Sequence, residues 1–152
     1  MRLGVISDTH GLLRPQAIAA LRGCATLVHA GDIGSLEVLA GLQALAAVTA
    51  VRGNNDVDDW SLDVPEEVTF EIDEVRIHLL HDVKRLAIDP IAERVNVVIA
   101  GHSHSPSIDR REGVLYFNPG SAGPRRFRLP IAVGILEIRG SDVQPRIVEL
   151  DI

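Results

Sequence analysis

The chain has 152 residues, of which 15 are lysine or arginine and 21 are aspartate or glutamate, and its formal net charge is −6. This length suits one domain. A lone cysteine, Cys24, excludes a disulfide framework and a zinc site built from cysteines, and it fits a reducing compartment. No apolar run approaches the roughly 20 residues that a membrane span needs, and the acidic excess argues against a broad nucleic-acid-binding surface. We therefore expect a cytoplasmic protein whose residues 1–152 form one domain.

The first third of the chain alternates short apolar runs with helix-like stretches. Strands are predicted over residues 3–6, 25–30 and 47–51. One helix is predicted from Pro15, which suits a first helical turn, to Arg22, and a second follows Ser35, an expected N-cap, through Leu45. This β-α-β-α-β order predicts a parallel sheet that is buried on both faces.

The pattern changes after Trp60. Strands are predicted over residues 67–72 and 75–80 with a hairpin turn between them, followed by a helix over residues 84–94 that Pro90 interrupts. Further strands are expected over residues 95–100, 114–117, 132–138 and 143–150, in a mainly antiparallel second half. The chain shows no repeat and no linker, so one α/β domain is the economical interpretation.

Polar side chains follow nearly every predicted strand. Because the carboxyl ends of parallel strands meet at one edge of a sheet, we expect these segments to converge. In an extended segment, residues i and i+2 point to the same side. Asp8 and His10 can therefore reach one common centre, and so can His102 and His104. Histidine, aspartate and asparagine together form the donor set that suits Zn, Mn, Fe or Ni. The segments are Asp8-Thr9-His10, Gly31-Asp32, Gly53-Asn54-Asn55-Asp56, His81-Asp82 and Gly101-His102-Ser103-His104.

In this order the motifs resemble those of the calcineurin-like metallophosphoesterase superfamily. That pattern is Asp-x-His, Gly-Asp, Gly-Asn, a histidine after a strand, and Gly-His-x-His, and the segment Asn118-Pro119-Gly120-Ser121 is similar to a marker of its small, minimal phosphodiesterase branch. The resemblance spans residues 3–126. It implies a four-layer α/β-β/α sandwich, in which two mixed sheets are flanked by helices, with no cap domain.

The resemblance also implies two divalent metal ions, which could be Mn, Ni, Zn, Fe or Mg. By position, one ion would bind Asp8, His10 and His104, and the other would bind Asn54, His81 and His102. Asp32 would bridge the two. The protein would then be a metal-dependent phosphodiesterase that hydrolyses a small phosphoester through a hydroxide bridging the ions.

The chain departs from the family pattern at two positions. Asn55 stands where many members have a histidine that protonates the leaving group, and an amide cannot deliver a proton at neutral pH. We therefore expect slower turnover with alkoxide than with phenolate leaving groups. Asp82 follows His81 where the family commonly has glycine, and it could either crowd the second ion or support a ligand.

The remaining polar residues have two interpretations each. Arg125 and Arg126 belong to the densest basic cluster, which could hold a second phosphate group of the substrate or form a solvated loop. His29, on an apolar strand, is expected to be a hydrogen-bonded core histidine rather than a ligand, and Asp56 either orients the loop or is solvated. A strand-edge dimer through residues 143–150 would be compatible with this fold.

Two alternative functions remain at this stage. A nucleotidase or phosphomonoesterase would use the same metal centre. The retromer scaffold subunit resembles the same fold without catalytic competence, so a protein-binding scaffold is the second alternative. All seven predicted ligand positions carry side chains that can bind a metal, which favours the enzyme.

Overall fold

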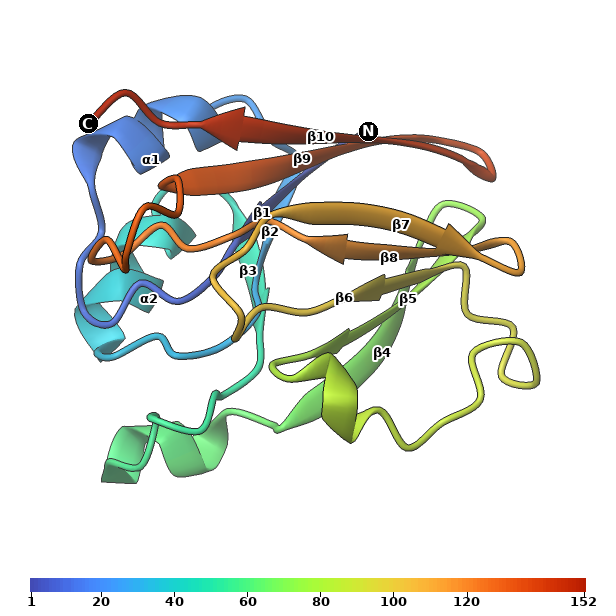
Figure 1. The fold of residues 1–152 in the computed structure, drawn as a ribbon, viewed down its shortest axis with the longest axis horizontal. Helices are drawn as coiled ribbons and strands as arrows, with labels where there is room; N and C mark the ends of the chain where they lie inside the picture. The colour runs from blue at the N-terminus through green and yellow to red at the C-terminus, as the bar shows by residue number, and fades with distance from the viewer.

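The apolar runs form two five-stranded sheets whose inner faces make the main core. A computed structural model describes all residues 1–152. Figure 1 shows the two sheets, and their facing sides bury a cluster to which both contribute, including Leu3 and Val28 from one sheet and Ile77, Ile99 and Phe117 from the other. The expected α/β sandwich of two mixed sheets is therefore confirmed.

The first sheet has the strand order β10-β9-β1-β2-β3. Its parallel part, predicted from the first third of the chain, pairs β1 with β2 and β2 with β3. Strand β9 pairs antiparallel with both β1 and β10, so the last two strands of the chain belong to the same sheet as the first three. The strands are β1 (Arg2–Ile6), β2 (Thr26–His29), β3 (Ala47–Ala50), β9 (Ala132–Arg139) and β10 (Asp142–Glu149).

The second sheet has the order β4-β5-β6-β8-β7. Its three central strands are parallel and only the two edge strands are antiparallel, so the expected mainly antiparallel second half is wrong at the centre of this sheet. Strand β7 was not predicted, because all five of its residues are exposed and it lacks an apolar run. The strands are β4 (Glu67–Ile72), β5 (Val75–Leu80), β6 (Val97–Ile99), β7 (Ser107–Arg111) and β8 (Val114–Asn118).

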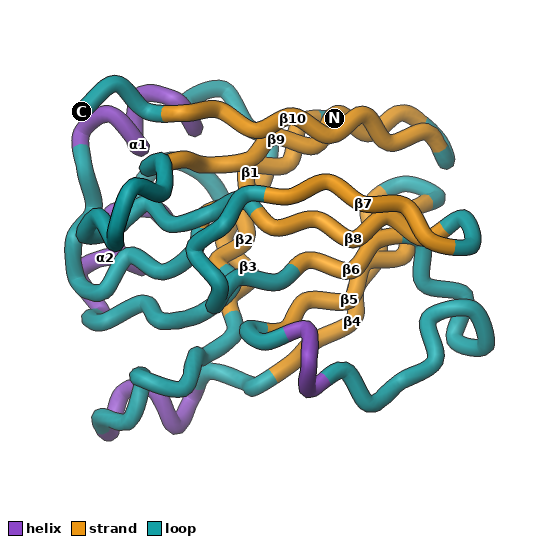
Figure 2. Tube along the Cα trace, in the orientation of Figure 1, coloured by secondary structure: helices purple, strands orange, loops and turns teal.

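Two helices, α1 (Pro15–Leu21) and α2 (Leu36–Gln43), cover the outer face of the first sheet, as predicted. The helix expected over residues 84–94 does not form. A single 3-10 turn, η2 (Val83–Arg85), is followed by a loop, because Pro90 cannot donate the backbone hydrogen bond that a helix requires there. Figure 2 shows this loop beside β4 and β5, and its Leu86 and Ile88 cover the second sheet in place of a helix. A second 3-10 turn, η1 (Asp59–Asp63), follows β3.

The structure contains no helix with the length and apolar character needed to cross a membrane.

Candidate metal centre

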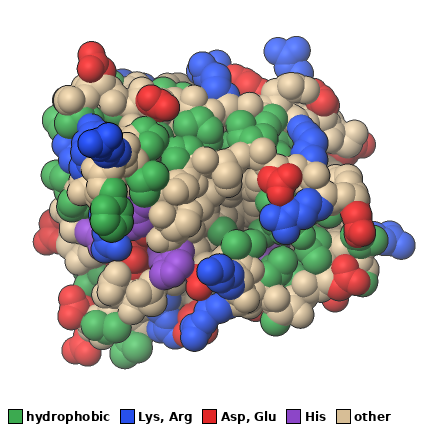
Figure 3. Space-filling view, in the orientation of Figure 1, with side chains coloured by type: hydrophobic (Ala, Val, Ile, Leu, Met, Phe, Trp, Pro, Cys, Tyr) green, Lys and Arg blue, Asp and Glu red, His purple; other side chains and the backbone are tan.

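The loops that follow β1, β2, β5 and β6 meet at one end of the molecule, and backbone hydrogen bonds hold them together. Asp8 N–H donates to the Gly31 carbonyl at 3.0 Å, and Gly101 N–H donates to the His81 carbonyl at 2.9 Å. A third bond crosses between the sheets, from the backbone N–H of His102 to Oδ2 of Asp8 at 3.0 Å. In Figure 3 histidine side chains gather at the left of the molecule, where Figure 1 shows these loops. The predicted convergence of the strand ends is therefore found.

One group of possible metal-binding atoms consists of Asp8, His10 and His104, which lie within 4.8 Å of one another. Oδ1 of Asp8 is 3.3 Å from Nε2 of His104 and 4.0 Å from Nε2 of His10. Asp8 is fully buried. These are the three residues that the resemblance assigns to one ion.

A second group consists of Asp8, Asp32 and His81. Oδ2 of Asp32 lies 3.3 Å from Nε2 of His81 and 3.7 Å from Nε2 of His10, so this oxygen stands between one histidine of each group. That position suits the bridging role expected for Asp32. Asp8 is also shared, since its Oδ1 is 3.9 Å from His81, and no bridging role was expected for it.

His102 and Asn54 lie beside the second group. Nδ1 of His102 is 3.2 Å from Nε2 of His81, and its side chain is 45 % exposed. Asn54 is exposed and, with His81 and His102, lines a pocket of about 740 Å³. Neither residue belongs to the two compact groups, although both border them. Asp82 also lines this pocket, with its Oδ2 3.8 Å from Nε2 of His102, which puts it beside a predicted ligand.

The chemistry of these side chains fits a bound cation. Nδ1 of His81 lies 2.7 Å from the Ala30 carbonyl, to which it donates, so the Nε2 lone pair of the neutral ring faces the carboxylate of Asp32. A lone pair and a carboxylate repel each other unless a proton or a cation lies between them. Asp8 Oδ1, His10 Nε2 and His104 Nδ1 are buried and have no hydrogen-bond partner in the protein. Divalent ions would satisfy Asp8 and His10 directly.

The backbone at these residues is not extended, contrary to the expectation for both i, i+2 pairs. Five of the seven predicted ligands have positive φ angles, between 47° and 70°. This left-handed region is uncommon for residues other than glycine, and such residues cluster at functional sites. The chain therefore curls at each strand end and turns its side chains into the centre. The five are Asp8, His10, Asp32, His102 and His104.

The electrostatics of the centre favour a negatively charged Asp32. Burial raises its pKa, but hydrogen bonds with His81 and Asn55 outweigh burial and hold the pKa well below the usual range. Burial lowers the pKa of His81, yet a proton on its Nε2, bonded to Asp32, and the charge of Asp8 raise the pKa overall. Without a metal ion, this proton takes the place of the cation between the two side chains. His104 behaves in the opposite way, because burial dominates and lowers its pKa. The ionised carboxylate is the form that binds a metal.

Residues around the ligands hold them in place. The Asp56 carboxylate accepts hydrogen bonds from the backbone N–H groups of Ile33, Gly34 and Gly53 at 2.9–3.0 Å, so it is a buried loop-orienting residue and not a solvated one. His29 is fully buried and bonded to Thr9 and to the Gly31 N–H, as expected for a core histidine.

Two positioning serines were not predicted. Ser7 Oγ donates to Oδ2 of Asp8 at 2.7 Å, and Ser121 Oγ donates to the Asp8 carbonyl at 3.1 Å. The available signals were the position of Ser7 next to Asp8 and the place of Ser121 in the Asn118–Ser121 motif.

The predicted substrate-binding arginines lie on the exposed loop between β8 and β9. Arg125 Nη1 donates to the Leu129 carbonyl at 3.2 Å. The positive charge of Arg126 contributes to the lowered pKa of His104, which places Arg126 on the side of the first group.

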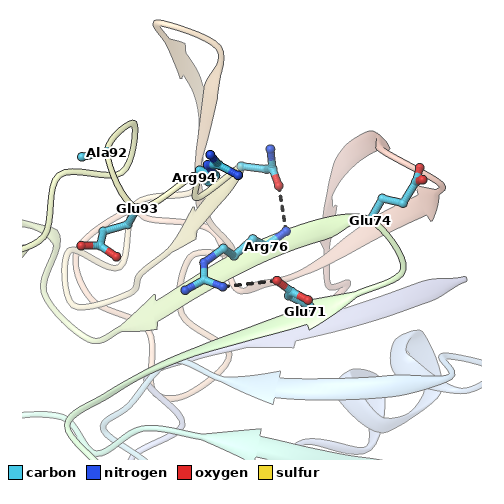
Figure 4. Close-up of a pocket in the computed structure, with 7 residues that line it drawn as sticks. Glu71, Glu74, Arg76, Ala92, Glu93 and Arg94 are labelled. Atoms are coloured by element: carbon cyan, nitrogen blue, oxygen red, sulfur yellow. Dashed lines mark hydrogen bonds and ion pairs between the residues drawn. The ribbon is translucent and has the colours of Figure 1, made fainter.

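A second pocket, of about 560 Å³, lies away from the centre (Figure 4). Arg76 is the second residue of β5 and Asn96 immediately precedes β6, so the pocket lies at the opposite ends of these strands from His81 and His102. Arg76 is held there by Glu71 and by the side chain of Asn96. This pocket contains none of the predicted site residues.

Comparisons with known proteins agree with the geometry. A domain model of the calcineurin-like phosphoesterase superfamily matches residues 1–141. A probable metallophosphoesterase from Methanothermobacter thermautotrophicus is 34 % identical over 97 % of this chain and 92 % of its own length. Phosphodiesterase MJ0936 from Methanocaldococcus jannaschii is 28 % identical over 98 % of this chain and all of its own.

Among solved structures, wild-type Vps29 from Entamoeba histolytica, complexed with zinc, superimposes with a TM-score of 0.76 and 25 % identity. The match covers 99 % of this chain and all of that one. Sequence and fold lead to the same assignment: this chain belongs to the calcineurin-like phosphoesterase superfamily.

Proposed function

We propose that this protein is a phosphodiesterase that uses two divalent metal ions to hydrolyse a small phosphodiester. The superfamily is one of phosphoesterases, and relatives such as MJ0936 are named phosphodiesterases, which supports a hydrolase. The observation that carries the proposal is the pair of carboxylates, Asp8 and Asp32, each of which faces histidines on both sides of the centre. Two shared carboxylates between two sets of histidines suit two ions better than one.

In this proposal Asp8, His10 and His104 hold the first ion, Asn54, His81 and His102 hold the second, and Asp32 lies between them. Bound divalent ions supply an activated water as the nucleophile and neutralise charge on the phosphoryl oxygens. The protein keeps its ligands in the binding form: the Ala30 carbonyl orients His81, and Ser7 and the His102 N–H orient Asp8. The mixed nitrogen and oxygen donors suit Mn, Zn, Fe or Ni better than Mg, which prefers oxygen ligands.

The leaving group receives no proton from a histidine at position 55. Asn55 instead donates to Asp32 from its backbone N–H and from its side-chain amide. Substrates whose leaving groups are stable as anions are therefore the best candidates. The pocket of about 740 Å³ next to His81 and His102 provides the space for one arm of such a diester.

The proposed substrate is a small phosphoester, and Arg125 and Arg126 are proposed to bind its negatively charged phosphate. The proposal includes neither a nucleic-acid-binding surface nor a membrane. A cytoplasmic location accords with the free Cys24. A dimer could form through β10, which lies at the edge of the first sheet.

The test begins with protein stripped by a chelator and then reloaded with Mn, Ni, Mg or Zn. We expect hydrolysis of bis(p-nitrophenyl) phosphate to return with metal, and Asp32→Asn and His102→Ala to lose both activity and bound metal, measured by elemental analysis. Asp109→Asn, at an exposed aspartate on β7, is the matched control and should change neither. Equal activity in the Asp32 and control variants would overturn the proposal. Protein that binds no metal would favour the scaffold alternative, and faster hydrolysis of p-nitrophenyl phosphate would favour the phosphomonoesterase.

A further inference from the structure

A tight turn with the sequence Arg125-Arg126-Phe127-Arg128, here called the RRFR turn, lies between β8 and β9. It is closed by the Leu129 N–H, which donates to the Arg126 carbonyl at 3.1 Å. The base of the loop is closed by the Ala132 N–H, which donates to the Ser121 carbonyl at 3.0 Å. Two backbone hydrogen bonds thus define the turn and the base of its loop.

Phe127 occupies an unfavourable position at the tip of this turn. Its side chain is 92 % exposed, more than any other large apolar residue of the protein, and its φ is 54°. Exposure of an aromatic ring forgoes the hydrophobic gain of burial, and a positive φ is strained for a bulky side chain. Strain of this kind is characteristic of ligand-binding positions. Arg126 and Arg128 precede and follow Phe127 in the sequence, so the turn carries an exposed aromatic ring in a positively charged segment.

The base of the loop that carries the RRFR turn contacts the candidate metal centre. Ser121, at the base of the loop, donates to the Asp8 carbonyl, and Arg14 donates to the Gly123 carbonyl at 3.2 Å. A side chain at Gly123 would collide with the backbone of Asp8 and Thr9, so this part of the loop lies against the first group of ligands. Figure 1 shows the segment between β8 and β9 at the same end of the molecule as the loop that follows β1.

The turn and the 740 Å³ pocket therefore border different parts of the centre. The pocket is lined by Asn54, His81 and His102, on the side of the second group. The base of the loop that carries the turn contacts Asp8, and burial and the positive charge of Arg126 lower the pKa of His104, so the turn is on the side of the first group. A phosphodiester bound between the two groups has two arms. Asn55, at the position where the family has its leaving-group acid, contacts Asp32 and follows Asn54, so the leaving arm belongs on the pocket side.

We propose that Phe127 binds the retained arm of the substrate by stacking on a planar aromatic ring, such as a nucleobase, while the neighbouring arginines attract its anionic phosphate. An aromatic side chain stacks on any base, and arginine adds charge and further stacking surface. This inference rests on the proposed function and names its substrate class as phosphodiesters with an aromatic or nucleoside retained arm. Phe127 is a specificity-determining residue in this scheme and takes no part in bond breaking.

The test compares three substrates with the same leaving group, p-nitrophenolate, and different retained arms: thymidine 5′-yl, phenyl and methyl. Loss of a base–aromatic stack weakens binding about 5- to 150-fold. We expect Phe127→Ala to raise KM by a factor in this range for the thymidine and phenyl esters, with kcat little changed. The methyl ester should change less than about twofold, because a methyl group has no ring to stack. Phe127→Tyr should restore the preference, and Ile91→Ala, at an exposed aliphatic residue, should alter nothing.

A binding measurement separates this inference from the proposed function. Calorimetry with metal-loaded protein should show that Phe127→Ala weakens binding of thymidine 5′-monophosphate but not of methyl phosphate. Equal effects of Phe127→Ala on all three esters and both monoesters, or no effect on any, would overturn the role of Phe127. If the wild-type protein hydrolysed none of the esters, the proposed function would fail, and the two monoesters would still decide whether Phe127 stacks on a ring.

Discussion

Asn55 donates a hydrogen bond to each carboxylate oxygen of Asp32, from its backbone N–H to Oδ1 at 2.9 Å and from its side-chain amide to Oδ2 at 3.0 Å. The residue that replaces the family's acid histidine therefore orients the carboxylate between the two groups of ligands. One hydrogen of its side-chain amide bonds to Asp32, and the amide has no proton to deliver at neutral pH.

This arrangement predicts a strong dependence of rate on the leaving group. With aryl thymidine phosphates of graded phenol pKa, kcat should fall steeply as the phenol becomes less acidic, because charge on the departing oxygen is not neutralised by proton transfer. Asn55→His should flatten this dependence while lowering metal affinity, since the side-chain bond to Oδ2 of Asp32 is lost and only the backbone bond remains. Initial rates across the series measure both effects. An equally flat dependence in the wild-type protein would contradict the assignment.

Bound metal should stabilise the fold. An ion present at about 100 times its Kd stabilises the native state by about 2.7 kcal/mol, which corresponds to a rise in Tm of about 5–10 °C for a chain of this size. Thermal unfolding of chelated and reloaded protein measures the shift. Asp32→Asn should show little of the rise, whereas Asp109→Asn should show all of it. A rise of the same size in both variants would place the stabilising ion elsewhere.

Asp56 should matter for stability more than its place in a loop suggests. Removing a carboxylate that accepts three backbone hydrogen bonds leaves buried donors unsatisfied, and we expect Asp56→Ala to cost about 3 kcal/mol. Urea unfolding of the metal-free protein gives the value directly. Asp58→Ala is the matched control, because Asp58 lies in the same loop and its side chain is exposed. A loss below about 0.5 kcal/mol, the level of an ordinary surface substitution, would refute the anchoring role.

His29 should make folding stability sensitive to acid. Thr9 donates its hydroxyl to the Ile33 carbonyl and so accepts from Nε2–H of His29, while the Gly31 N–H donates to Nδ1, and both ring nitrogens are thereby satisfied in the neutral form. Burial, with a smaller effect of His81, lowers the pKa of His29 from 6.5 to about 3.

Between these pKa values the unfolded chain binds a proton that the folded chain does not. The contribution of neutral His29 is therefore complete above pH 6.5 and declines as the pH falls toward 3, with a slope of up to about 1.4 kcal/mol per pH unit. His29→Gln should reduce the measured pH slope of the unfolding free energy by this amount. In the wild-type protein, the NMR shifts of the His29 ring should stay constant between about pH 7 and pH 4.5. Titration near pH 6.5 would disprove this interpretation.

Much of the fold and the centre could be predicted because buried strands carry dense apolar runs. Strands β4 and β5 occur with the predicted bounds, and the polar segments after the strands converge as expected. Strand β7 could not be predicted, since its pairing with β8 is a backbone interaction that its exposed side chains do not reveal. The loop over residues 84–94 packs Leu86 and Ile88 against the second sheet. A helix that covered the sheet would need a similar apolar pattern, so the sequence did not distinguish the two.

Details of the centre depend on contacts between distant segments, which local patterns do not encode. The left-handed backbone at Asp8 and His104, and the second contact of Asp8 with His81, arise only when the loops pack together. The exposure of Phe127 is a further example, because an apolar side chain by itself suggests a place in the core. Its exposure follows from the turn that carries it.

The centre joins the two sheets: Asp8, His10 and Asp32 follow strands of the first, and His81, His102 and His104 follow strands of the second. His102 and Asp8, linked by a hydrogen bond, are 94 positions apart in the chain. No partly assembled chain can bring these side chains together, so the proposed ions could bind only after the two sheets have docked. Under the proposed function, activity would therefore depend on correct docking of the two sheets, because only docked molecules could acquire the ions.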